Sequence, residues 1–240
     1  MARRLTRSKK QGSDPWSSEK TVPAKFEKER KNPPLLAMNE TQAEYIADIM
    51  TKDQVVVLGP AGTGKTYIAS TIAADLLRGG KINKIVLTRP NVPGGRSIGF
   101  FPGELAEKMA PWVVPFTSVI ETRMGAAAYA IAVKHGDIEV VPFEVMRGRT
   151  FENAFIILDE AQNTTCEEMK MFLTRVGNDS KLVVNGDVKQ SDIKGVSGLT
   201  KILQMIRFGN LPVEIVEFTL DDIVRSGVCA MWTRAFEERD

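Results

Sequence analysis

The sequence predicts an α/β fold with a single core, in which a mostly parallel sheet carries helices on both faces. Two observations indicate it: short apolar runs recur along the chain, and stretches with helical spacing of apolar residues lie between several of them. Short continuous apolar runs are typical of strands that are buried on both faces, as in parallel sheets. Their alternation with helices favours an architecture of βαβ units.

The expected elements follow this alternation from residue 39 onward. Asn39 is suited to cap a first helix, because its side chain can accept a hydrogen bond from a backbone N–H of the first turn. The first strand, at residues 55–58, stops at Gly59. Further strands are expected at residues 84–88, 138–141, 155–158, 181–184 and 213–218, and further helices at 66–77, 103–123, 165–176 and 199–206.

The composition divides the chain into a tail, residues 1–36, and one domain, residues 37–240. The tail has few aliphatic side chains and cannot bury enough apolar surface to offset its ordering entropy, so we expect it to be disordered or extended. Residues 1–31 carry ten basic and four acidic side chains. Such a tail can reach phosphates in nucleic acid or at a membrane surface, or it can simply be solvated, and both interpretations stay open.

The composition also disfavours several classes of protein. The longest apolar runs fall short of the roughly 18 residues that a membrane-spanning helix needs, and the N-terminus lacks a secretory signal. Two cysteines and one histidine are too few for a disulfide framework or a Cys/His metal cluster. We therefore expect a cytoplasmic protein with no membrane partner.

The turn after the first strand matches the P-loop pattern G-x-x-x-x-G-K-[ST] at every fixed position. Its glycines let successive backbone N–H groups curl around phosphate oxygens, and the next helix adds its positive dipole end. We expect Lys65 to contact the β- and γ-phosphates of ATP and the Thr66 hydroxyl to ligate Mg²⁺. The motif predicts a P-loop NTPase with a RecA-like core, whose nucleotide-binding turn comprises Gly59, Pro60, Ala61, Gly62, Thr63, Gly64, Lys65 and Thr66.

An acid pair, Asp159 and Glu160, follows the strand expected at residues 155–158. In open α/β sheets, ligands bind at the carboxyl ends of the strands, so Asp159 is placed to hold Mg²⁺. Glu160 is then placed to orient and deprotonate an attacking water, which favours a hydrolase over a passive nucleotide binder. Solvated acids at a strand end are the plainer alternative, and the P-loop upstream weighs against it.

The strand at residues 181–184 is followed by polar residues that include Gln190. A polar side chain after a strand between the P-loop and the acid pair can touch the γ-phosphate and respond to its loss. We choose Gln190 for that role, and an exposed loop glutamine is the alternative.

Several segments taken together resemble the PhoH family, a group of single-core P-loop ATPases related to the superfamily 1 helicases. The resemblance covers about residues 39–228, and the compact chain looks like the versions found in bacteriophage genomes. The segments that carry it are GPAGTGKT, LTRP, GFFPGELAEKMAPWVVPF, MRGRTFENAFIILDEAQNTT, FLTRVG and NGDVKQSDI.

The resemblance implies roles for further residues. Gln42 corresponds to a glutamine that reads the adenine edge, and a surface helix glutamine is the alternative. Gln162 follows the acid pair and is implied to link ATP to a strand-binding surface. Arg89 lies in a nucleic-acid-contacting motif, whereas Arg147 and Arg149 are candidates to meet phosphate or a neighbouring subunit.

Arg225 corresponds to a late arginine of the family and is the candidate arginine finger. Its alternative is a salt bridge to Asp221 or Asp222 at helical spacing. A single core leaves one wall of the site open, so we expect a homo-oligomer, with a hexameric ring in which Arg225 reaches across the interface.

The expected function is therefore Mg²⁺-dependent ATP hydrolysis by an oligomer that acts on single-stranded RNA or DNA. Backbone-dominated nucleic-acid binding is expected, since aromatic residues are scarce. Two alternatives remain: a nucleotide-switched interaction module, and a small-molecule kinase, against which Glu160 speaks.

Overall fold

The computed structural model describes residues 32–90 and 105–237. Residues 1–31, which belong to the expected tail of residues 1–36, lie outside them, as do residues 91–104 and 238–240. Residues 34–240 form one compact unit, and the fold described below is the fold of that unit.

The centre of this unit is a six-stranded sheet whose strands all pair in parallel, in the order β3-β2-β4-β5-β1-β6. The parallel α/β fold expected from the apolar runs is confirmed. The strands are β1 (Gln54–Leu58), β2 (Lys84–Thr88), β3 (Ile138–Val140), β4 (Ala154–Leu158), β5 (Lys181–Gly186) and β6 (Glu214–Glu217).

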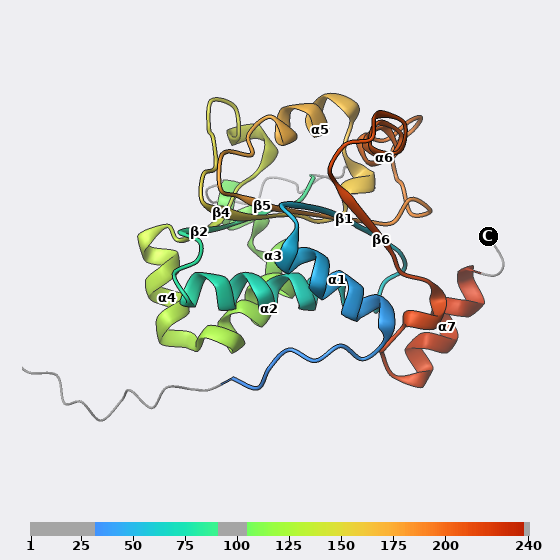
Figure 1. The fold of residues 1–240 in the computed structure, drawn as a ribbon, viewed down its shortest axis with the longest axis horizontal. Coiled ribbons are helices and arrows are strands. Elements are labelled where there is room, and N and C mark those ends of the chain that lie inside the picture. The colour runs from blue at the N-terminus through green and yellow to red at the C-terminus, as the bar shows by residue number, and fades with distance from the viewer. Residues whose placement is uncertain (1–31, 91–104, 238–240) are drawn as a thin grey trace, which may run out of the picture. The chain divides into compact units, whose positions relative to one another are not determined.

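Helices cover both faces of the sheet. Figure 1 shows α1, α2, α3 and α4 on one face and α5 and α6 on the other. Two helices, α4 and α7, were not among the expected elements. The helices are α1 (Glu40–Thr51), α2 (Lys65–Arg78), α3 (Leu105–Met124), α4 (Ala126–His135), α5 (Cys166–Leu173), α6 (Gly198–Gly209) and α7 (Gly227–Glu237), with short 3-10 turns η1 (Phe143–Val145), η2 (Ala161–Asn163) and η3 (Leu220–Asp222).

Each face of the sheet has its own apolar core, because side chains alternate along each strand. On β1, Val55 and Val57 join the core beneath α1 and α2, whereas Val56 and Leu58 join the core beneath α5 and α6. Burial on both faces explains why the strands read as continuous apolar runs. The sheet is therefore a rigid platform, and its carboxyl edge presents the loops after β1, β4 and β5 side by side.

Local signals explain where the helices begin. The side chain of Asn39 caps α1 by accepting a hydrogen bond from the backbone N–H of Gln42, as expected. Thr165 and Glu168 form a capping box at the start of α5, in which each side chain binds the other's backbone N–H. In the described part of the chain, no helix is both long and apolar enough to cross a membrane.

Candidate functional site

The strand order brings the two sequence motifs together. β5 lies between β4 and β1, so the turn after β1 and the acids after β4 flank the end of one shared neighbour. The backbone joins these strand ends, since the N–H of Gly59 donates to the carbonyl of Gly186 at 3.2 Å and the N–H of Asp159 donates to that of Thr88 at 3.0 Å. The expected P-loop and acid pair therefore lie at one edge of the sheet.

The P-loop adopts a backbone conformation that glycine alone tolerates well. Gly59, Gly62 and Gly64 have φ angles of +127°, +91° and +94°, in a region that L side chains rarely occupy. A Cβ at Gly59 would lie 2.4 Å from the carbonyl oxygen of Phe218, which is a clash with backbone. The glycines of the motif are therefore required by the shape of the turn.

Lys65 lies at the first position of α2 and folds over the loop. Its ammonium donates to the carbonyls of Gly59 at 2.6 Å and Pro60 at 2.7 Å. Burial lowers the pKa of Lys65, and the acidic groups of Asp187, Asp159 and Glu160 oppose that shift. The ammonium is thus held at the mouth of the loop, within the field of the acids.

The Asp159 carboxyl group is harder to ionise than a free one. Burial, followed by the neighbouring Glu160 carboxylate, raises the pKa of Asp159 to about 6, although Arg89 and Lys65 oppose the shift. Glu160 itself has φ +51° and ψ +41°, a left-handed conformation that costs of order 1–3 kcal/mol for a residue other than glycine. Such a conformation persists only where its surroundings enforce it.

Arg89, expected to contact nucleic acid, lies instead against both acids. One guanidinium nitrogen is 3.8 Å from Oδ2 of Asp159 and the other is 3.5 Å from Oε1 of Glu160. The guanidinium also lies over the ring of Trp112, 5.4 Å from its centroid, and donates to the Trp112 carbonyl at 3.4 Å. Its contact with nucleic acid stays a prediction.

Gln162 makes the shortest contact with Glu160. Its Nε2 donates to Oε2 of Glu160 at 2.6 Å, and its Oε1 accepts from the backbone N–H of Asp187 at 3.0 Å. Only 1% of Gln162 is exposed. A Cβ at Gly186 would lie 3.1 Å from Gln162 Oε1, so the glycine gives the amide room. Gln162 thus joins the acid pair to the loop after β5, a contact that spacing alone did not reveal.

Gln42 is buried beneath the P-loop rather than exposed on the surface of α1. Its Nε2 donates to the carbonyl of Thr63 at 2.9 Å, and its Oε1 accepts from the N–H of Met38 at 2.9 Å. The alternative of a surface glutamine is therefore wrong. Contact with adenine stays a prediction, with the amide next to Gly64.

Arg225 packs on the P-loop of its own chain. A Cβ at Gly62 would lie 3.0 Å from Arg225 Cδ, and the N–H of Val224 donates to the Gly62 carbonyl at 3.1 Å. The alternative salt bridge to Asp221 is replaced by one between Asp221 and Arg234, at 2.9 Å. Asp222 likewise accepts its hydrogen bonds from Thr219. Arg225 thus lies at the P-loop of its own chain, and its reach across an interface between subunits stays a prediction.

Lys65, the acid pair, Arg89 and Arg225 line one cleft of about 420 Å³, a size that suits a small-molecule ligand, whereas Gln42 and Gln162 lie outside its lining. Gln190 is not among its lining residues; it is exposed, and its N–H donates to the carbonyl of Asp187 at 3.2 Å. A sensing role for Gln190 stays a prediction. The cleft is lined by Ala61, Gly62, Gly64, Lys65, Thr66, Tyr67, Arg89, Pro115, Val119, Asp159, Glu160, Val224 and Arg225.

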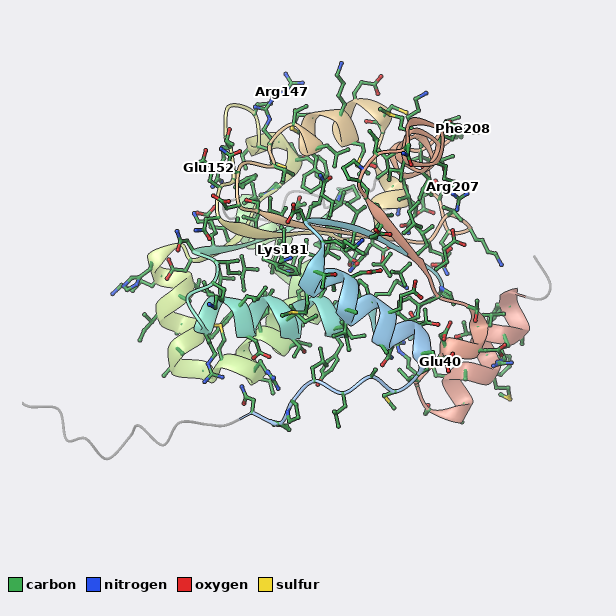
Figure 2. All side chains as sticks on the ribbon, viewed as in Figure 1. Glu40, Arg147, Glu152, Lys181, Arg207 and Phe208 are labelled. Carbon is green, nitrogen blue, oxygen red and sulfur yellow. The ribbon has the colours of Figure 1, made fainter. Side chains whose placement is uncertain are left out.

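Arg147 and Arg149 lie at the opposite, amino edge of the sheet. Arg147 is exposed on the outer side of the molecule (Figure 2). Arg149 pairs with Glu139 at 2.5 Å and lies over the ring of Phe151, 5.0 Å from its centroid. The structure does not bring either arginine to the P-loop, and their contact with nucleic acid or another subunit stays a prediction.

The cleft offers oxygen ligands of the kind that Mg²⁺ prefers, from Thr66 and Asp159. Among residues 32–90 and 105–237, no group of three or more His, Cys, Asp or Glu is arranged to hold a metal ion on its own. Mg²⁺ typically takes one or two protein ligands together with substrate phosphates. Thr66 and Asp159 line the same cleft as the P-loop, so the residues present fit the ion.

The sequence comparisons match this chain to one protein family. A family model described as PhoH-like protein matches residues 34–237. Protein PhoH of Escherichia coli (strain K12) is 43% identical over 211 residues, which are 86% of this chain and 59% of that protein. A PhoH-like protein of Bacillus subtilis (strain 168) is 44% identical over 201 residues, 83% of this chain and 63% of that protein. The chain thus spans about three fifths of the length of these relatives.

A solved structure of Pif1 helicase from Candida albicans aligns with 77% of this chain and 41% of its own, with a TM-score of 0.39 and 14% identity.

Proposed function

The chain belongs to the PhoH family of P-loop proteins, and from this premise we propose that it binds ATP with Mg²⁺ and hydrolyses it in the cleft at the carboxyl edge of the sheet. One observation carries the proposal: Lys65 and Thr66 of the P-loop line the same cleft as Asp159 and Glu160. A P-loop alone supports nucleotide binding, whereas a carboxylate pair beside it supports activation of water.

Each residue then has a chemical task. The N–H groups of the P-loop and the Lys65 ammonium bind the phosphates, and Thr66 and Asp159 hold the metal ion. When bound, Mg²⁺ neutralises phosphate charge. Glu160 orients the attacking water and accepts its proton, which is worth roughly 10²–10⁴ in rate. Arg225, at the P-loop of its own chain, stabilises the charge that develops on the transferred group.

Gln42 and Gln190 complete the proposed cycle. Gln42, tied to the Thr63 carbonyl, is assigned to the adenine edge. Gln190 is assigned to report phosphate loss, and its N–H already contacts Asp187 in the loop that Gln162 joins to Glu160.

The second ligand in the proposal is single-stranded RNA or DNA, and the protein acts as a helicase-like or remodelling ATPase in the cytoplasm. The basic side chains of residues 1–31 and the exposed ring of Trp112 support it. The assembly is proposed to be a homo-oligomer, with a hexameric ring as its form. Specific activity should then fall upon dilution that dissociates the assembly, and an unchanged value would contradict the oligomer.

A nucleotide-switched interaction module is the second candidate, and the surface of α7 favours it. This helix begins two residues after Arg225 and exposes a row of large apolar side chains. A partner seated there would lie next to a residue of the nucleotide cleft. The row comprises Val228, Met231, Trp232 and Phe236.

Steady-state phosphate release from Mg²⁺-ATP, with and without single-stranded RNA and DNA, tests the proposal and separates the candidates. Stimulation by nucleic acid supports a nucleic-acid-dependent ATPase, and hydrolysis that RNA and DNA leave unchanged favours the interaction module. Phosphoryl transfer to a small acceptor in place of phosphate release indicates the kinase alternative. No hydrolysis under any of these conditions contradicts the proposed function.

A further inference from the structure

We propose that Arg89, held by Trp112 of α3, is a positioning residue that fixes the carboxylate of Glu160 for hydrolysis. The inference rests on the proposed function of the cleft. Arg89 thereby gains a role in hydrolysis, and α3 is the helix that connects the protein surface to the carboxylate of Glu160.

The two oxygens of Glu160 have separate partners. Gln162 donates to Oε2 at 2.6 Å, and Arg89 lies 3.5 Å from Oε1. A carboxylate bound at one oxygen can still rotate about its final bond, whereas partners at both oxygens define its plane. The backbone of Glu160 is left-handed, and such a strained conformation also needs neighbouring groups that hold it in place.

Arg89 can hold Glu160 only if the guanidinium is itself held. Trp112 does so in two ways: its ring lies 5.4 Å from the guanidinium carbon, and its carbonyl accepts a hydrogen bond at 3.4 Å. A planar guanidinium can stack on the ring and present a donor fork to the carboxylate at once, which the compact ammonium of lysine cannot do. Arg89 thus bridges the end of β2 and the helix α3.

Helix α3 is both a wall of the cleft and part of the protein surface. Pro115 and Val119 of α3 line the cleft, whereas 44% of Trp112 is exposed. Pro111 and Pro115 lie inside the helix, where each lacks the N–H of a regular helical hydrogen bond. A ligand that contacts the exposed part of Trp112 therefore touches a side chain that is two contacts away from Glu160.

A role in positioning makes a different prediction from a role in charge balance alone. A plain counter-ion at this place is replaceable by lysine, because the charge is retained. A positioning role needs the fork and the stacked ring, so Arg89→Lys should recover little activity, whereas Trp112→Phe should recover most of what Trp112→Leu loses.

The test is steady-state hydrolysis of Mg²⁺-ATP by the full chain, without nucleic acid. Arg89→Ala should lower kcat by about 10–100-fold, the usual range for a residue that orients a functional ligand, and should change KM by less than about threefold. Trp112→Leu should lower kcat by a few-fold in the same pattern. Binding of a fluorescent ADP analogue should remain close to wild type in each variant.

Arg207→Ala is the control, since Arg207 also pairs with a carboxylate, that of Glu217, and is not among the residues that line the cleft. Its hydrolysis without nucleic acid should match wild type. A second readout is independent of turnover: with Trp16 and Trp232 replaced by Phe, the emission of Trp112 should shift when Arg89 is replaced by Gln. Thermal unfolding verifies that each variant is folded.

Several results would overturn the inference. An unchanged kcat in Arg89→Ala excludes positioning, a raised KM with unchanged kcat makes Arg89 a nucleotide contact, and a raised kcat makes it an inhibitory counter-ion. Full recovery in Arg89→Lys reduces its role to charge. If the wild-type chain itself fails to hydrolyse ATP, the proposed function fails and the inference with it. Hydrolysis at the wild-type rate in Arg89→Ala leaves the proposed function standing and removes only the inference.

Discussion

The two edges of the sheet carry the same arrangement of side chains but differ in how many cations contact each carboxylate. At each edge an arginine lies over an aromatic ring and pairs with carboxylate: Arg89 over Trp112 at the carboxyl edge, and Arg149 over Phe151 at the amino edge. The likeness of the two clusters means that neither the residue types nor the stacking distinguishes a functional cluster from a structural one.

The counter-charge distinguishes them. Glu139 at the amino edge has two cations in contact, Lys84 at 2.6 Å and Arg149 at 2.5 Å. Burial alone would raise the pKa of Glu139, but the hydrogen bonds from these two cations outweigh it, and its pKa lies below the ordinary value. The negative charge of Glu139 is therefore compensated by its two neighbouring cations.

At the carboxyl edge, by contrast, the carboxylates have fewer cations in contact with them. Arg89 is shared by Asp159 and Glu160 at 3.8 and 3.5 Å, and burial, followed by the Glu160 carboxylate, raises the pKa of Asp159 to about 6 despite this arginine. Two carboxylates that share one arginine leave room for a further cation beside them, as a metal–nucleotide site would require. The comparison thus relates function to the imbalance of charge.

The largest difference should be seen in turnover. Glu160→Gln removes the base that is proposed to activate water, so kcat should fall by roughly 10²–10⁴-fold while the nucleotide still binds. Glu139→Gln, the same change at the amino edge, should leave kcat close to wild type. Phosphate release and ADP-analogue binding by the two variants measure this, and a similar kcat in both would show that the edges do not differ in function.

The next difference concerns stability and has the opposite sign at the two edges. Asp159 binds its proton more tightly in the folded state, so its ionisation lowers the free energy of unfolding as pH rises from about 4 to about 6. Asp159→Asn removes that penalty and should stabilise the Mg²⁺-free protein by roughly 3 kcal/mol at pH 7, with no gain at pH 4. Urea unfolding at both pH values measures it. A variant less stable than wild type at pH 7 would contradict the charge imbalance.

The smallest expected effect is a loss of stability when Glu139 at the amino edge is replaced. Glu139 has a depressed folded-state pKa, so it contributes stability that is present above its unfolded pKa and is lost as pH falls through the folded pKa. Glu139→Gln should lower the free energy of unfolding by roughly 1 kcal/mol at pH 7, since the pair is partly exposed and screened. The loss should shrink in acid. A loss that is constant with pH would point to packing instead of charge.

The sequence predicts the sheet well because its four central strands, β2, β4, β5 and β1, each contain a continuous apolar run. It did not predict α4, in which Ala132 is the only buried side chain among the described residues, or α7, which exposes Val228, Met231, Trp232 and Phe236. Helix α4 is apolar at nearly every position, so it lacks the one-sided spacing on which a helix prediction depends, whereas α7 has that spacing and was overlooked.

The two halves of the cleft could be predicted because each is a contiguous motif next to a strand. The contacts between them could not. That Arg89 contacts Glu160, and that Gln162 joins Glu160 to Asp187, depends on β2, β4 and β5 being neighbours. Strand order is a property of the folded chain, and spacing in the sequence does not contain it. The Arg149 cluster was missed for the same reason, since Glu139 and Lys84 come from separate strands.

The central claim is that the carboxyl edge binds a metal–nucleotide complex through Lys65 and Asp159. Calorimetric titration of the wild-type chain with a non-hydrolysable ATP analogue, with and without Mg²⁺, tests it most directly. Binding should be at least about tenfold tighter with Mg²⁺, should lose that preference in Asp159→Asn, and should disappear in Lys65→Ala. Equal heats for wild type and Lys65→Ala, or an affinity that Mg²⁺ leaves unchanged, would contradict the claim.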